Sequence, residues 1–301
     1  MKTTSAASPQ PRRILVPVDF SDHSREALRA ALALAQQFGS RLAVVHVTRR
    51  NRPDSHVVAE QMGITFDTRR LGRAKLQEFM EGEGIGGIQP TRLVADGVPF
   101  DEIVGAAKAW RADLIVIATH GYTGLKHVLL GSTTERVVGH APCPVLVVRS
   151  RAQRGKKAAF SPGRVRSILA PVDFSASSRG AVQYALALAQ QYEAQLCLLH
   201  VIKPYQADLL VDTTESQRDV RVAAHQSLAK LADATKKAWP HTGRELRRGH
   251  PVDTITALAK RTNADLIVMG THGRSGVTRA ILGSVAERVV RHAPCSVLVV
   301  R

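Results

Sequence analysis

The chain has 301 residues, enough for two domains of ordinary size that each bury a core. Its 44% hydrophobic and 22% charged residues are typical of globular proteins and exclude wholesale disorder. The formal net charge of +17 attracts polyanions in general. Nucleic-acid binding is nevertheless not expected, because the sequence shows no helix-turn-helix, RNP or zinc-finger pattern.

The sequence gives no sign of membrane insertion or export. Its apolar stretches are too short and too interrupted to span a bilayer. Residues 1–11 are polar, and we expect a disordered tail there rather than a signal peptide. The three cysteines, Cys143, Cys197 and Cys295, form no Cys-x-x-Cys pair, so we expect reduced thiols, no zinc site and a cytoplasmic location.

Apolar runs and amphipathic segments alternate along the first half of the chain. A Val/Ile/Leu-rich run predicts a buried strand at 13–18, and Ser21 or Asp22 can cap the helix that follows it. The remaining predicted elements are a strand at 41–48, a helix near 67–82, a strand near 90–95, a helix from Pro99 to about 110, a strand at 113–118, a helix at 132–139 and a strand at 144–149. This alternation predicts an α/β domain with a five-stranded parallel sheet and helices on both faces.

The second half of the chain repeats the first. The segments that recur are Arg13–Ser21 as Ser167–Ser175, Ala112–Val116 as Ala264–Val268, and His140–Arg149 as His292–Arg301. A repeat of about 150 residues indicates a duplicated domain rather than a solenoid. We therefore expect one doubly wound domain over 1–150, a basic linker over 151–165 and a second domain over 166–301.

Ligands of such sheets bind beyond the carboxyl ends of the strands, and two loops should meet there. The first loop follows the first strand and carries Asp19, or Asp173 in the repeat. A carboxylate in this place can accept hydrogen bonds from a ribose diol or an adenine amine. It can also simply cap the next helix, and the residues alone leave both interpretations open.

The second loop is rich in glycine. In the second half it reads Gly270-Thr-His-Gly273, nine further residues, and then Gly283-Ser284. Glycines let backbone N–H groups approach a phosphate, and the start of the following helix attracts anions. Ser284 can add a donor or cap that helix. Arg274 and Arg279 lie in the loop and can neutralise a polyphosphate.

These motifs together resemble the universal stress protein family, specifically its tandem two-domain members, over nearly the whole chain. ATP-binding members carry Gly-x2-Gly-x9-Gly-Ser/Thr after the fourth strand, and the second half matches this pattern in full. The resemblance implies a site for ATP, ADP or AMP, with magnesium as a companion. Its residues would be Pro171, Val172, Asp173, Val201, Gly249, Gly270, His272, Gly273, Arg274, Gly283, Ser284 and Val285.

The resemblance also assigns roles and a matching site in the first half. By analogy, Asp173 holds the adenosine, Val201 touches the adenine and Gly249 lies near the base. The matching residues of the first half are Pro17, Val18, Asp19, Val47, Gly97, Ala118, Gly121, Gly131, Ser132 and Thr133. Ala118 departs from the pattern, since it replaces the first glycine. If that position needs a positive φ, alanine costs about 1–2 kcal/mol, so the second half is predicted to bind more tightly.

The predicted function is that of a stress-response binding module whose nucleotide occupancy changes its conformation or partners. One alternative is a slow ATPase or nucleotidyl-transfer enzyme on the same fold, and another is a dimerising regulatory module without nucleotide. The sequence has no His-x-Gly-His signature and no obvious general base beside the glycine loop, so at most weak ATP hydrolysis is expected.

Two further repeated features have simpler interpretations. The histidine pairs His46/His200, His120/His272 and His140/His292 follow from duplication and lack metal-site spacing. The Val-Leu-Val-Val run that ends each half predicts an edge strand, and edges are usually protected by pairing. In the resembled family these strands mediate dimer contacts, so we expect the two halves, or two chains, to associate there.

Overall fold

The computed structural model describes residues 10–48, 68–83, 87–119, 130–149, 151–153, 156–158, 160–204, 214–272 and 282–301. The chain divides into two compact units. The first unit is Pro11–Cys143, and the second unit contains Pro144–Arg301. Within the described segments, no helix combines the length and the apolar character that crossing a membrane requires.

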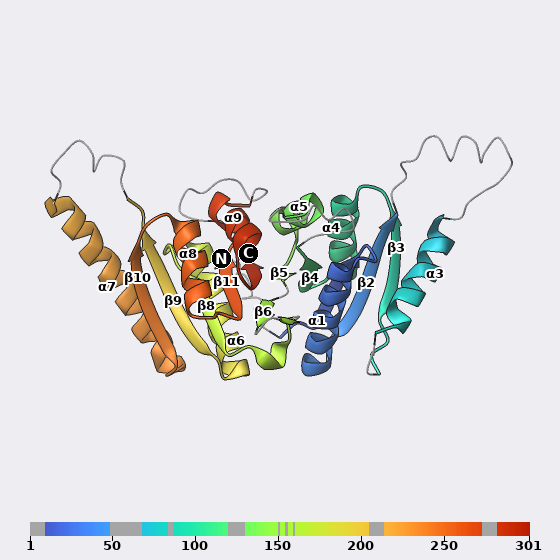
Figure 1. Cartoon of the computed structure of the whole chain (residues 1–301), viewed down its shortest axis with the longest axis horizontal. Helices are drawn as coiled ribbons and strands as arrows, with labels where there is room; N and C mark the ends of the chain where they lie inside the picture. The colour runs from blue at the N-terminus through green and yellow to red at the C-terminus, as the bar shows by residue number, and fades with distance from the viewer. Residues whose placement is uncertain are drawn as a thin grey trace, which may run out of the picture. The chain divides into compact units, whose positions relative to one another are not determined.

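The first unit alternates strands and helices in the predicted order (Figure 1). Its sheet has the order β4-β1-β2-β3, and the paired strands run parallel. Its elements are β1 (Arg13–Val18), α1 (Asp22–Phe38), β2 (Arg41–Thr48), α3 (Thr68–Glu81), β3 (Thr91–Asp96), α4 (Pro99–Trp110), β4 (Leu114–Ala118) and α5 (Ser132–His140).

The second unit has five parallel strands in the order β10-β9-β8-β11-β12, which confirms the predicted α/β class. Its repeated elements are β8 (Ser167–Pro171), α6 (Ala176–Tyr192), β9 (Gln195–Ile202), α7 (Thr214–Ala238), β10 (Thr242–Arg248), α8 (Pro251–Arg261), β11 (Leu266–Gly270), α9 (Ser284–His292) and β12 (Ser296–Val300). They are preceded by β5 (Val145–Val148), the hairpin strands β6 (Arg151–Gln153) and β7 (Lys156–Ala158), and the 3-10 turn η1 (Pro162–Arg164).

Strand β5 runs antiparallel to β12, with Leu146 opposite Leu298. Arg149, just after β5, donates from its guanidinium to the carbonyls of Val290 (3.2 Å) and Arg291 (2.8 Å) in the last turn of α9. A cation at a helix C-terminus is stabilising because the carbonyls there carry partial negative charge. Burial lowers the pKa of Arg149. Strand pairing with β12 and the two Arg149 hydrogen bonds together attach β5 to the second unit.

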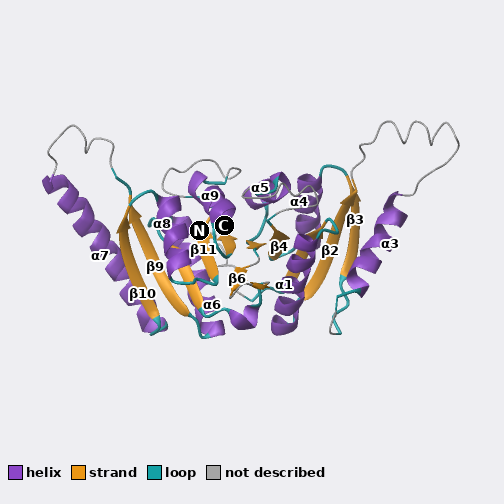
Figure 2. Ribbon diagram, in the orientation of Figure 1, coloured by secondary structure: helices purple, strands orange, loops and turns teal. Residues whose placement is uncertain are grey.

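The crossover connections between parallel strands carry the helices that cover the two faces of a sheet. In the second unit, α7 and α8 lie on opposite sides of β9 and β10 (Figure 2). The chain runs outward from β8 to β10 and then returns to β11, so the direction of winding reverses between β8 and β11. The corresponding reversal in the first unit lies between β1 and β4. In doubly wound sheets, ligands bind at the carboxyl ends of the strands at this reversal.

The repeated Ala-Asp-Leu-Ile-Val segment has a structural role at the opposite ends of the strands. The carboxylate of Asp113 accepts from the backbone N–H groups of Arg12 (2.9 Å) and Arg13 (3.0 Å). Asp265 does the same for Arg166 (2.9 Å) and Ser167 (3.1 Å). Each aspartate therefore satisfies backbone donors where the central strand of its unit begins.

Candidate functional site

The carboxyl ends of β8 and β11 bring the two predicted loops of the second unit together. Ile168 and Leu169 lie opposite Leu266 and Ile267, so the parallel strands end at the same edge. A hydrogen bond joins the loops directly, because the Ser175 hydroxyl donates to the carbonyl of His272 (3.5 Å). The Asp173 turn and the start of the glycine loop thus face one another at this edge.

The aspartate turn has the same backbone form in both units. The N–H of Ser175 donates to Asp173 (3.0 Å), and the N–H of Ser21 donates to Asp19 (3.1 Å). In each case the serine caps the next helix: Ser175 accepts from Ser178 N–H, and Ser21 accepts from Ser24 N–H. The aspartates therefore do not cap these helices. Helix capping does not explain why an aspartate lies at this edge of the sheet in both units.

A phenylalanine in a left-handed conformation follows each aspartate. Phe20 has φ 67° and Phe174 has φ 65°. The ring of Phe20 packs on His46, and that of Phe174 packs on His200. Nothing in the sequence signalled the left-handed φ, and the repeated histidines looked like a trace of duplication. The structure places all four side chains beside the aspartate turns.

Gly270 serves helix packing and not a special backbone conformation. Its φ is not positive, so the cost expected for alanine at this position does not arise. A Cβ on Gly270 would instead lie 2.3 Å from the Ser177 hydroxyl oxygen and 2.9 Å from the Ser177 carbonyl carbon. The first turn of α6 therefore passes directly over Gly270. Ala118, its counterpart, is buried at the end of β4.

Gly97 and Gly249 do require glycine. Their φ angles are 157° and 151°, and a Cβ on either would lie 2.7 Å from an oxygen of Glu102 or Thr254. Their N–H groups donate to Thr48 and Ile202, at 3.0 Å each, and so tie the ends of neighbouring strands together. Both glycines lie at the carboxyl edge where the resemblance places a nucleobase.

The helix at the end of the glycine loop starts at the same edge. Gly283 is the N-cap of α9, so Ser284 is the first helical residue and does not cap it. The N–H of Gly283 donates to Thr271 (2.8 Å), which fastens the helix start to the end of β11. In the first unit, Gly131 donates to Thr119 (2.9 Å) in the same way. First-turn N–H groups have no acceptor within the helix and are available to an anion.

The structure places the remaining predicted residues as follows. Pro17 and Val18 end β1, while Pro171 ends β8 and Val172 follows it. Val47 and Val201 lie near the carboxyl ends of β2 and β9. Ser132, Thr133 and Val285 lie in the first turns of α5 and α9. Gly121, Gly273, Arg274 and Arg279 lie outside the described residues.

Two buried polar atoms at the edge of the second unit make no hydrogen bond within the part of the chain that the structure describes. They are the hydroxyl oxygen of Ser177 and Nε2 of His272. The other ring nitrogen of His272 lies 2.9 Å from the Thr271 hydroxyl. A buried polar group without a partner costs about 1–3 kcal/mol, so such atoms call for an explanation. A ligand that supplies the missing partner is one such explanation.

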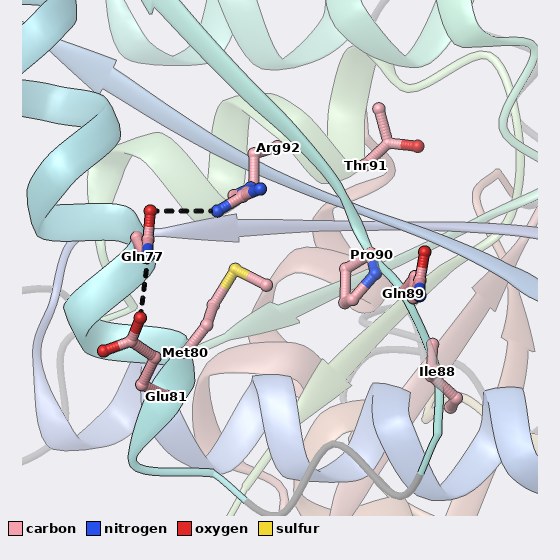
Figure 3. A pocket seen from close by; sticks show the side chains of 8 residues that line it. All are labelled: Gln77, Met80, Glu81, Ile88, Gln89, Pro90, Thr91 and Arg92. Atoms are coloured by element: carbon pink, nitrogen blue, oxygen red, sulfur yellow. Dashed lines mark hydrogen bonds between the residues drawn. The ribbon is translucent and has the colours of Figure 1, made fainter.

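A hollow in the first unit lies at the other end of its sheet (Figure 3). It has a volume of about 350 Å³ and lies between the end of α3 and the start of β3. Arg92 donates to Gln77 (3.2 Å), and Gln77 donates to Glu81 (2.8 Å). Its lining residues are mostly exposed and include none of the predicted site residues.

Comparison with known proteins identifies the family. A sequence profile of the universal stress protein family matches residues 11–149 and again 164–301. A universal stress protein of Mycolicibacterium smegmatis is 28% identical over 296 residues, which cover 96% of each chain. One of Methanocaldococcus jannaschii is 36% identical over 140 residues, covering 46% of this chain and 82% of that protein. The crystal structure of a universal stress protein from Archaeoglobus fulgidus has the same fold, with a TM-score of 0.65 and 23% identity, and the match covers 97% of this chain and 96% of that one. The chain belongs to the universal stress protein family and carries two copies of its domain in tandem.

Proposed function

We propose that the chain is a stress-response binding module that binds an adenine nucleotide at the carboxyl edge of the second unit. One observation carries the proposal. The Asp173 turn, the start of α9 and the two unpartnered buried polar atoms, on Ser177 and His272, lie at the same edge. A nucleotide has both the hydroxyl and amine donors that a carboxylate accepts and the phosphate oxygens that helix N–H groups and a serine hydroxyl bind.

Each group has a defined part in this proposal. Asp173 accepts from the ribose diol or the base amine, while the first-turn N–H groups at Ser284 and Val285 donate to phosphate oxygens. The Ser177 hydroxyl and His272 supply further polar contacts to the phosphate chain. Gly249 ties the ends of β9 and β10 together beside the proposed position of the base. Adenine, as opposed to another base, is proposed on the family resemblance.

Magnesium, in this proposal, enters with the phosphate chain of ATP and not through a protein site of its own. Among the described residues, no three His, Cys, Asp or Glu side chains come close enough together to hold a metal ion. Magnesium bound to nucleotides usually keeps several waters and phosphate oxygens as ligands. The family motif contributes no general base here, so we propose binding with at most slow hydrolysis.

The first unit is proposed to hold a second, weaker pocket around Asp19, Gly97, Gly131 and Ser132. The Ser21 hydroxyl donates to Asp19 (2.5 Å), whereas the matching Ser175 hydroxyl donates to the His272 carbonyl. A ligand donor must displace the Ser21 hydroxyl before it can use that carboxylate oxygen. We propose this competition, and not a backbone cost at Ala118, as a reason for weak binding in the first pocket.

We also propose that the module acts in the cytoplasm and associates through its last strands. The pairing of β5 with β12 and the Arg149 bonds to α9 support intrachain association of this kind. The same strands are proposed to serve between two chains when these form a homodimer. Size-exclusion chromatography with light scattering, with and without ATP, tests whether occupancy changes this association.

Calorimetric titration of the full chain with ATP, ADP and AMP tests the nucleotide proposal. We expect a dissociation constant in the micromolar range, corresponding to about 8 kcal/mol. Asp173→Asn should weaken binding about tenfold to a hundredfold, since a hydrogen bond to a charged group contributes roughly 1.5–3 kcal/mol. Asp253→Asn, which changes an exposed aspartate in the first turn of α8, is the matched control and should leave affinity unchanged.

The same preparation separates the alternatives. Absence of binding by all three nucleotides would leave only the nucleotide-independent dimerising module. Steady-state phosphate release at rates well above the background of an Asp173→Asn chain would instead favour the enzyme. Chromatography of nucleotide released from the freshly purified protein identifies the ligand that the cell supplies.

A further inference from the structure

His46 and His200 occupy the same place in the two units, beside the turns that carry Asp19 and Asp173. His46 lies in β2 directly opposite Val18 at the end of β1. His200 follows Leu199 in β9, and Leu199 lies opposite Pro171 at the end of β8. Each histidine is therefore level with the residue that immediately precedes the aspartate.

Each imidazole bonds to the carbonyl before the aspartate. Nδ1 of His200 lies 2.6 Å from the Val172 carbonyl oxygen, and Nδ1 of His46 lies 2.9 Å from that of Val18. A carbonyl oxygen only accepts, so Nδ1 must carry the hydrogen and donate it. Burial lowers the pKa of His46, which favours the neutral form of the ring, and the Val18 carbonyl selects the tautomer with the hydrogen on Nδ1.

The same imidazole packs on the phenylalanine after the aspartate. The ring centroids of Phe174 and His200 are 4.5 Å apart with an interplanar angle of 36°, and those of Phe20 and His46 are 4.2 Å apart at 35°. Both phenylalanines have left-handed φ angles, which cost an L-residue about 1–2 kcal/mol. Such a conformation persists only where its surroundings hold it.

The two turns keep these contacts although their other surroundings differ. In the first unit, Phe20 also packs against Phe79, and the Arg25 guanidinium lies 4.3 Å from the centroid of the Phe79 ring. In the second unit, the turn is instead bonded to the glycine loop through Ser175 and His272. The histidine contacts, common to both units, therefore belong to the aspartate turn and not to one local core.

We propose that His200, and His46 in the first unit, are positioning residues that hold the aspartate turn in its ligand-binding conformation. Each ring fixes the carbonyl before the aspartate and the side chain after it, so the backbone that carries the carboxylate is held in place while both contacts persist. The ligand-binding part of this role rests on the nucleotide site proposed above. A histidine that only filled space in the core would affect stability but would not act through Asp173.

The turn can be tested without any ligand. In the isotope-labelled full chain, the ¹³Cα and ¹³Cβ chemical shifts of Phe174 report its backbone conformation. His200→Ala should move them away from left-handed values, while His225→Ala, which removes an exposed histidine on α7, should not. If His200→Ala does not fold, His200→Phe keeps a ring against Phe174 and removes only the donor. Unchanged Phe174 shifts in a folded His200 variant would overturn the proposal.

A double-mutant cycle tests whether His200 acts through Asp173. In an Asp19→Ala background, which removes the first pocket's carboxylate, ATP affinity is measured for His200→Ala, Asp173→Ala and the pair. His200→Ala alone should weaken binding about tenfold, which corresponds to releasing the left-handed turn. Added to Asp173→Ala, it should change affinity less than about twofold, because groups that act as one unit are not additive. His200→Asn, whose side-chain amide can donate from about the position of Nδ1, should recover part of the loss.

The two experiments fail in different ways. Losses that multiply in the double variant would show that His200 does not work through the carboxylate, and would overturn the positioning role. If the Phe174 shifts move as expected but the parent chain binds no nucleotide, the nucleotide site is wrong and the structural hold of His200 on the turn stands.

Discussion

The two units carry the same Asp-Phe-Ser turn and bond it differently. Ser21 donates both its N–H and its hydroxyl to Asp19. Ser175 donates its N–H to Asp173, but its hydroxyl reaches across to the glycine loop at His272. A duplicated motif can thus keep its backbone while one hydroxyl changes partner, and that one change links the second aspartate turn to the phosphate side of the proposed pocket.

A second difference lies at the ends of the outer strands. In the first unit, Asp96 precedes Gly97, accepts from Thr48, and pairs with Arg69 (2.7 Å). In the second unit, Arg248 precedes Gly249, and Ile202 takes the place of Thr48. The paired acid of the first unit is therefore replaced by a basic residue at this corner of the edge, a difference that should favour an anionic ligand in the proposed second pocket.

The units also differ in how they fasten the helix on the outer part of the sheet. In the first, Glu83 is almost fully buried and pairs with Arg25 (2.9 Å) and Arg29 (2.6 Å) of α1. In the second, the indole N–H of Trp239 donates to the Ala194 carbonyl (2.8 Å). The first unit relies on a charged cluster where the second relies on a neutral hydrogen bond, so their stabilities should respond differently to acid.

Removing the charge of Glu83 should have the largest effect on this comparison. Glu83→Gln leaves two arginines without their carboxylate and should lower the free energy of unfolding of the first unit by about 3 kcal/mol. Denaturant unfolding, followed by a probe in each unit, measures it. Glu78→Gln, an exposed position on α3 shortly before Glu83, is the control. An equal loss of unfolding free energy in both units, or no loss in either, would contradict the proposed role of Glu83 in stabilising the first unit.

The same cluster predicts an acid response. Burial raises the pKa of Glu83, but the hydrogen bonds and charges of Arg29 and Arg25 outweigh it, so the net pKa is lowered. A lowered folded-state pKa gives stability that is present above the unfolded value, about 4.3, and is lost as pH falls through the folded value. Acidification below about pH 5 should therefore destabilise the parent chain more than Glu83→Gln. If the free energy of unfolding depends on pH in the same way in the parent chain and in Glu83→Gln, the Glu83 cluster is not the source of the acid response.

The glycine difference can be tested by exchanging the two residues. Gly270→Ala should destabilise the second unit by about 1–3 kcal/mol, because its Cβ meets the backbone of Ser177 and forces α6 to shift. Ala118→Gly should change nucleotide binding little, since the position does not need a positive φ. Thermal unfolding measures the stability of both variants, and calorimetric titration measures their nucleotide affinity. A large gain in affinity from Ala118→Gly would restore the original backbone argument.

The serine difference should give a smaller effect. Ser21→Gly removes the hydroxyl that competes for Asp19, while glycine costs a helix cap only a few tenths of a kcal/mol. Nucleotide affinity of the first pocket, measured in an Asp173→Ala chain, should rise about threefold, a change within the range of one neutral hydrogen bond. Ser175→Gly, measured for the second pocket, should show no such gain. Equal gains in both would mean that the hydroxyl partners do not distinguish the pockets.

The smallest expected effect concerns the reversed charge. Arg248→Ala should weaken ATP binding to the second pocket by about twofold to fivefold, since exposed charge pairs contribute up to about 1 kcal/mol. The difference from the parent chain should shrink as salt rises. Calorimetry at two ionic strengths measures both. A loss that is independent of salt would argue for a direct structural role of Arg248.

Much of the fold could be predicted from sequence, because apolar periodicity and caps act locally. The strand at 13–18 and the helix from Pro99 to Trp110 have the predicted bounds. The left-handed φ angles of Phe20, Arg111 and Glu193 could not be predicted, since no glycine marks them. The hairpin β6–β7 falls in the stretch expected to be a linker.

The site was harder to predict because the spacing of residues in the sequence does not tell whether a residue serves packing, turn geometry or ligand binding. The glycine at 270 matches a phosphate-loop pattern, yet its closest neighbour is the first turn of α6. His46 and His200 looked like by-products of duplication until their bonds to the aspartate turns became visible. Both depend on contacts between segments far apart in the chain, which no local pattern carries.

A crystal structure of the chain grown with ATP tests the central claim most directly. We expect ATP at the carboxyl edge of the second unit, with Asp173 on the nucleoside and the phosphates within hydrogen-bond distance of the N–H groups at the start of α9. Ser177 and His272 should then have gained the partners that they lack. Nucleotide bound elsewhere, or an edge whose α9 N–H groups and Asp173 remain without ligand at saturating ATP, would contradict it.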